Sequence, residues 1–98
     1  MDINKTKEDK KLTVEVKGRL DTTTAPELES ALKDSLDDVE LLTFDFTDLE
    51  YISSAGLRVL LSTQKTMNKI GEMELTGVND MVMEVLEVTG FSEILTIK

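Results

Sequence analysis

Two adjacent serines, Ser53 and Ser54, are the residues of this chain whose type and position best suit chemistry. They stand directly ahead of the small residues Ala55 and Gly56 and of a leucine-rich amphipathic segment that is predicted to be a helix. Ser54 is the expected N-cap, because its hydroxyl oxygen can accept a hydrogen bond from the amide of Gly56 or Leu57. No acidic side chain follows in the first turn. The unpaired amides of this turn are therefore expected to stay open to an anion.

The modification that suits such a helix start is phosphorylation. A phosphate on Ser54 adds about −1.5 to −2 charges, which the free amides and the helix dipole can stabilise. Gly56 costs about 1 kcal/mol relative to alanine inside a helix, so we expect it to be there to keep the approach unobstructed. A partner that docks on the bare helix start would meet the new charge beside Asp21, Asp48 and Glu50. We therefore expect phosphorylation to change binding and to leave folding intact.

The composition excludes several classes of function. The 98 residues contain neither histidine nor cysteine, which rules out a Ser-His-Asp hydrolase and a thiol nucleophile. We predict no enzyme activity, no cofactor and no metal site. With 11 Lys and Arg against 20 Asp and Glu, the net charge is −9, and such a chain repels nucleic acids and anionic membranes. The expected partner is a protein, and the lack of any apolar run of membrane-spanning or signal-peptide type favours a cytoplasmic location.

The hydrophobic pattern predicts one α/β domain over residues 1–98. Its architecture is a single mixed sheet of four to five strands with about three helices packed on it. The predicted order is β-β-α-β-α-β-α-β, with strands at 2–6, 11–16, 39–46, 72–77 and 93–98 and helices at 25–36, 55–70 and 80–88.

The ends of these elements are predicted from glycines and capping residues. Gly18 is expected to break the second strand, and residues 24–27 to form a capping box with proline in the first turn. Strand 39–46 is expected to be covered on both sides, with residues 47–56 as the turn after it. Asn79 is expected to cap the last helix.

Three segments resemble the STAS domain family, and in particular the free-standing bacterial anti-sigma factor antagonists. They are "GRLDTTTAPELESAL", "LLTFDFTDLEYISSAGLRVLL" and "TGFSEILTI", and the resemblance covers nearly the whole chain. It implies a protein that regulates transcription by partner switching. The unphosphorylated form would bind an anti-sigma factor that is a serine kinase, and so release a sigma factor. Phosphorylation by that kinase would end the complex, and a serine phosphatase would reverse the modification.

The resemblance also implies which residues act. Aligned on the glycine and leucine of the family pattern, the phosphoacceptor is Ser54. Ser53 stands where many members carry aspartate and is the second choice. The loop that holds Asp21 resembles the second contact surface of the family. The predicted partner-binding residues are Asp21, Thr22, Thr23, Thr24, Ser53, Ser54, Ala55, Gly56 and Arg58.

Two other functions fit parts of the sequence. "DSLDDVELL" looks like the phosphopantetheine attachment site of an acyl carrier protein, with Ser35 as the acceptor. Carrier proteins are helical bundles, whereas a strand-like run follows this segment. A STAS scaffold or lipid-transport accessory domain without sigma regulation is the second alternative, and the presence of an acceptor serine argues against the lipid role.

Overall fold

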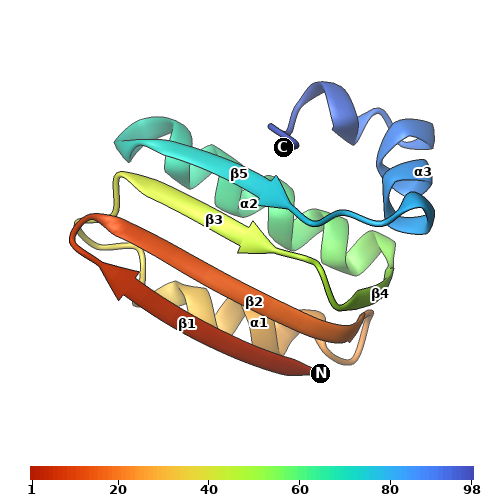
Figure 1. Cartoon of the computed structure of the whole chain (residues 1–98), viewed down its shortest axis with the longest axis horizontal. Coiled ribbons are helices and arrows are strands. Elements are labelled where there is room, and N and C mark those ends of the chain that lie inside the picture. Colours follow the sequence, from red (N-terminus) through yellow and green to blue (C-terminus); the bar gives the residue numbers. More distant parts are fainter.

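The computed structural model describes all residues, 1–98, and confirms the α/β class (Figure 1). Five strands form a mixed sheet and three α-helices pack against it, as the sequence predicts. The elements in chain order are β1 Asp2–Glu8, β2 Lys11–Leu20, α1 Ala25–Lys33, β3 Leu41–Asp45, β4 Leu49–Ile52, α2 Ser54–Ile70, β5 Glu72–Thr76, α3 Asp80–Val88 and a 3₁₀ helix Phe91–Glu93. None of the helices combines the length and the hydropathy that crossing a bilayer requires.

The sheet is organised around β2. Its order is β1-β2-β3-β5, with β1 antiparallel to β2 and the other neighbours parallel. The end of β2, residues 18–20, pairs in parallel with β4, which lies off this path. Gly18 does not end the strand as predicted. It adopts φ of 93° at a shift of register, a conformation that suits glycine, and β2 continues to Leu20.

Strand β4 is the element that the sequence did not reveal, since residues 47–56 were expected to be a turn. β4 has only four residues, and Leu49 and Ile52 at its ends are its two buried side chains. So short a strand gives no clear pattern of alternating hydrophobicity, and its partner residues lie 31 or 32 positions earlier in the chain. Tertiary pairing therefore decides its conformation.

Helices α1 and α2 lie together on one face of the sheet (Figure 1). The inward side chains of the strands, such as Val14, Val16 and Phe44, are fully buried. The opposite side chains, among them Thr13 and Thr43, are only half-buried. The prediction that 39–46 is covered on both sides is wrong, because no helix lies over the second face.

Two of the predicted caps have different outcomes. Asn79 caps α3 as expected, because its side chain accepts a hydrogen bond from the amide of Val82 at 2.8 Å. Its amide nitrogen also donates to the carbonyl of Leu49 at 2.7 Å and so ties α3 to β4. The capping box at Thr24 does not form. The Thr24 hydroxyl instead donates to the carbonyl of Arg19, and α1 ends at Lys33, before the predicted residue 36.

The predicted last strand is also absent. The amides of Ile94 and Leu95 donate to the carbonyl of Phe91 at 3.0 and 2.9 Å, which continues a helical turn past α3. Only an isolated bridge from Ile97 to Leu75 joins this segment to β5. Local helical hydrogen bonds therefore take the backbone groups that a full strand would have needed.

The start of α2 packs closely on the strands beneath it at Gly56. A Cβ atom at this position would lie 2.7 Å from Cγ of Leu20 and 2.9 Å from Cγ1 of Ile52. Carbon atoms in contact are normally about 3.5 to 4.0 Å apart. The absence of a side chain at Gly56 is therefore what allows the first turn of α2 to approach β2 and β4.

We predict that Gly56→Ala lowers the free energy of unfolding by about 1 to 3 kcal/mol, the usual range for overpacking a core. Helix propensity alone would raise the free energy of unfolding by about 1 kcal/mol, so the sign of the measured change shows which of the two effects dominates. Urea unfolding of both proteins measures it. A variant as stable as the parent, or more stable, would contradict the close approach.

Candidate functional site

The candidate site begins where β4 passes into α2. Ser53 is the N-cap of α2, with extended φ and ψ of −102° and 176°, and Ser54 is the first helical residue. The prediction of Ser54 as N-cap is wrong by one position. The amide of Ser53 donates to the carbonyl of Leu20 at 2.9 Å, and its own carbonyl accepts from the amide of Leu57 at 2.9 Å. Ser53 thus belongs to the extended strand and also begins the helix.

The two serine side chains lie in different environments. The hydroxyl oxygen of Ser53 is buried and has no hydrogen-bond partner. Ser54 is exposed to solvent. Neither hydroxyl caps the helix. Ser53 is at the N-cap position but its side chain makes no hydrogen bond to the first turn, and Ser54 is already a helical residue. Of the two, only Ser54 lies within reach of another protein.

Three amides at this helix start have no acceptor. They belong to Ser54, Ala55 and Gly56, whereas the amide of Leu57 donates to the carbonyl of Ser53 and not to the Ser54 hydroxyl. The first turn contains no acidic residue. Free amides and the positive end of the helix dipole favour a negative charge at this position. The arrangement can stabilise an anion that is attached to Ser54.

The small residues of the turn have another role than the sequence suggested. Gly56 is buried against Leu20 and Ile52, and Ala55 is half-buried at the edge of the hydrophobic core. They do not clear a path to the serines. The site is open because Ser54 is at the surface, while Gly56 brings the helix close to the sheet.

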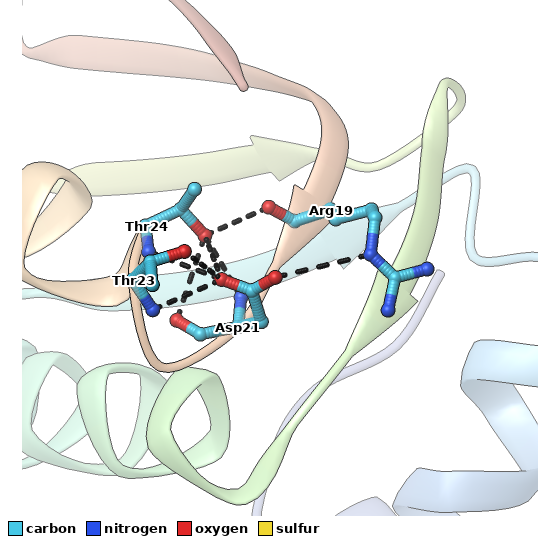
Figure 2. Close-up of polar contacts among 4 residues, drawn as sticks. All are labelled: Arg19, Asp21, Thr23 and Thr24. Atoms are coloured by element: carbon cyan, nitrogen blue, oxygen red, sulfur yellow. Dashed lines mark hydrogen bonds and ion pairs between the residues drawn. The ribbon is translucent and has the colours of Figure 1, made fainter.

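The loop Asp21–Thr24 is held together by hydrogen bonds to one carboxylate (Figure 2). One oxygen of Asp21, Oδ1, accepts from the Thr23 hydroxyl at 2.7 Å and from the Thr23 amide at 3.0 Å. It also accepts from the amide of Thr24 at 3.2 Å. The hydroxyl of Thr24 bridges the loop, since it donates to the carbonyl of Arg19 and accepts from the amide of Asp21, both at 2.8 Å. The loop is therefore a fixed surface feature.

These hydrogen bonds determine the ionisation of Asp21. The bond from the Thr23 hydroxyl, with those from the amides of Thr23 and Thr24, lowers the pKa of Asp21 below its ordinary value. Partial desolvation acts in the opposite direction and is outweighed. Because the folded-state pKa is depressed, this stabilisation is present above the ordinary pKa and is lost as the pH falls through the lowered one.

Two residues beside the loop were missed by the sequence analysis. Arg19 lies opposite Tyr51 in the β2–β4 register, and its guanidinium carbon is 4.3 Å from the centre of the Tyr51 ring. Nε of Arg19 is 3.8 Å from the carboxylate of Asp21 (Figure 2). The sequence pattern does not predict this contact, because the contact depends on the pairing of β2 with β4 and the sequence predicts a turn where β4 lies.

The structure brings the loop and the helix start together. Leu20 and Ile52 are register partners at the ends of parallel strands, so the segments that follow them emerge at the same edge of the sheet. A shallow groove of about 340 Å³ runs between the starts of α1 and α2. Its lining residues are Thr22, Ala25, Pro26, Glu29, Ala55, Arg58, Val59 and Ser62. Thr22 and Arg58, both named from the sequence, thus line one groove beside Ser54.

The alternative acceptor, Ser35, lies elsewhere. Its hydroxyl donates to the carbonyl of Ala31 at 2.8 Å and accepts from the ammonium group of Lys5 at 2.8 Å. It follows the end of α1 in a chain that is built on a mixed sheet. An acyl carrier protein is a helical bundle, so the fold contradicts this alternative.

Comparisons with known proteins agree with this fold. The sequence model of the STAS domain family matches residues 2–98. The chain is 33% identical over 85 residues to the anti-sigma-B factor antagonist of Listeria monocytogenes, a match that covers 85% of this chain and 75% of that protein.

Solved structures of related fold include an anti-sigma factor antagonist from Mycobacterium paratuberculosis. It superposes with a TM-score of 0.89 at 24% identity, over 98% of this chain and 83% of the other. The Bacillus cell fate determinant SpoIIAA in its phosphorylated form superposes with a TM-score of 0.77 at 13% identity, over 99% of this chain and 91% of the other.

We predict that Thr23→Val raises the pKa of Asp21 toward its ordinary value, because the hydroxyl that donates the shortest hydrogen bond is removed. An NMR titration of the Asp21 carboxyl group measures the shift. Thr22→Val is the matched control, since Thr22 is exposed and makes no hydrogen bond to this carboxylate. Equal titration curves for the two variants would show that the Thr23 hydroxyl does not control Asp21.

Proposed function

We propose that this chain, which belongs to the STAS domain family and is an anti-sigma factor antagonist, is a switch that is turned off by phosphorylation of Ser54. In its unphosphorylated form it would bind an anti-sigma factor that is also a serine kinase, and so release a sigma factor. The modified form would not bind, and a serine phosphatase would restore it. The switch would operate in the cytoplasm.

The observation that carries this proposal is the difference between the two serines. A kinase must reach the hydroxyl that it modifies, and Ser54 is exposed whereas the hydroxyl of Ser53 is buried. This difference favours Ser54 over its neighbour as the acceptor. A solved structure of SpoIIAA in a phosphorylated form supports the proposal that a protein of this fold can carry a phosphate.

The electrostatics of the site explain how one phosphate could control binding. The free amides of Ser54 and Ala55 can stabilise the added charge, so the fold tolerates it. The segment that leads into Ser54 already carries the exposed Asp48 and Glu50, in a chain of net charge −9. A partner that fits the neutral surface would have to bury or oppose a dianion, and like-charge juxtaposition costs several kcal/mol. Phosphorylation would thus weaken the complex without unfolding the protein.

The role is regulatory rather than catalytic. The chain offers no histidine or cysteine for a nucleophile or general base, so we assign ATP and the phosphoryl-transfer chemistry to the kinase partner. The groove that Thr22 and Arg58 line lies beside Ser54 and is the surface we propose for the partner, together with the loop Asp21–Thr24.

Incubation with the anti-sigma factor kinase and ATP is predicted to add one phosphate to the chain, located at Ser54 by mass spectrometry of the peptides. Ser54→Ala should abolish the mass gain, because the reachable hydroxyl is lost. Ser53→Ala is the matched control and should still be modified. Phosphate found on Ser53 in the unaltered chain would contradict the assignment.

Binding to the same kinase should follow the charge at position 54. Ser54→Ala is predicted to bind as tightly as the unmodified chain and to stay bound when ATP is added. Ser54→Asp is predicted to bind at least tenfold more weakly, a loss of about 1.4 kcal/mol, because it places a carboxylate at the contact surface. Isothermal titration calorimetry measures both. If Ser54→Asp bound with unchanged affinity, a negative charge at position 54 would not control binding, and the proposed switch would be contradicted.

A further inference from the structure

Arg58 lies on the exposed side of α2, and no carboxylate in the structure forms an ion pair with it. It is exposed, and the ion pairs of the chain join Lys10 to Glu40 and Arg19 to Asp21. Arg19 is also held by its contact with Tyr51. Arg58 is therefore the free basic side chain on the first two turns of the helix that Ser54 begins.

The helix places Arg58 one turn after Ser54. Residues four apart in an α-helix are neighbours on its surface, with Cβ atoms about 5 to 6 Å apart. The order also matters, since an anion on the N-terminal side of a cation at this spacing gives the better interaction. Guanidinium groups bind phosphate with two parallel hydrogen bonds, and the arginine side chain is long enough to span one turn.

We propose that Arg58 is the internal counter-ion of phosphorylated Ser54. Once a phosphate is attached, the guanidinium turns toward it and holds it over the free amides of Ser54 and Ala55. The phosphate is then bound from two sides, by the helix start and by Arg58. This role rests on the proposed function. It extends that function by naming Arg58 as the residue of this chain that stabilises the dianionic form of the phosphate and holds it at a fixed position.

The neighbouring carboxylate that could compete for Arg58 is Glu29, which lines the same groove from α1. No ion pair joins the two residues in the structure. A phosphate dianion carries about twice the charge of a carboxylate and is attached one turn away on the same helix. Arg58 should therefore pair with the phosphate of Ser54 and not with the carboxylate of Glu29.

The test places phosphoserine at position 54 during synthesis of the full chain, so that no kinase is needed. A ³¹P NMR titration then gives the second pKa of the phosphate, which is about 6 in an unperturbed phosphoserine. In Arg58→Gln this pKa is expected to rise by roughly 0.2 to 0.7 of a pH unit, the shift that an exposed ion pair produces.

Lys65→Gln is the matched control, because it removes the same charge from an exposed position of the same helix. It lies eleven residues beyond Ser54, about 16 Å along the axis, where salt screens the interaction. A rise in Arg58→Gln alone supports the counter-ion. Equal shifts in both variants, or no shift, would overturn it. Failure of any kinase to modify Ser54 would refute the proposed function while leaving this result unaffected.

Discussion

The pairing of the last residues of β2 with β4 is the interaction on which the site depends. The register joins Leu20 to Ile52, and the amide of Ser53 donates to the carbonyl of Leu20. Because the two strands are parallel, the loop after β2 and the helix after β4 leave the sheet at the same edge. This pairing is therefore what brings the loop Asp21–Thr24 next to Ser53 and Ser54.

The same pairing explains why the first turn of α2 contains glycine. The helix starts directly over the two paired strand ends, and a side chain at Gly56 would collide with those of Leu20 and Ile52. Glycine is unfavourable inside a helix by about 1 kcal/mol relative to alanine. The fold tolerates this loss because only a residue without a side chain lets the helix pack so closely on the strands. Gly56 therefore serves the packing of α2, and it affects the site only because it determines where the start of α2 lies.

Two consecutive serines serve two different purposes in this arrangement. Ser53 is the last extended residue, and its hydroxyl lies buried beneath the surface. Ser54 is the first helical residue and is exposed. The change from strand to helix between them turns the side chains in different directions. A charge added to Ser54 would therefore lie at the surface beside the free amides of the helix start, away from the hydrophobic core.

The sequence by itself determined the elements whose patterns are long or locally capped. Residues 54–70 have the helical spacing of apolar side chains, and Asn79 begins α3 through a hydrogen bond three residues away. The α/β class, the mixed sheet and the placing of Ser54 near a helix start followed from such local signals. Only the tertiary structure decided that β4 is a strand, that Gly18 lies within β2 and that residues 93–98 form no strand. It also decided which serine is exposed and that Arg19 meets Tyr51. The physical reason is that local hydrogen bonds and periodicity act over a few residues, whereas strand pairing and burial depend on partners about 30 residues away in the chain.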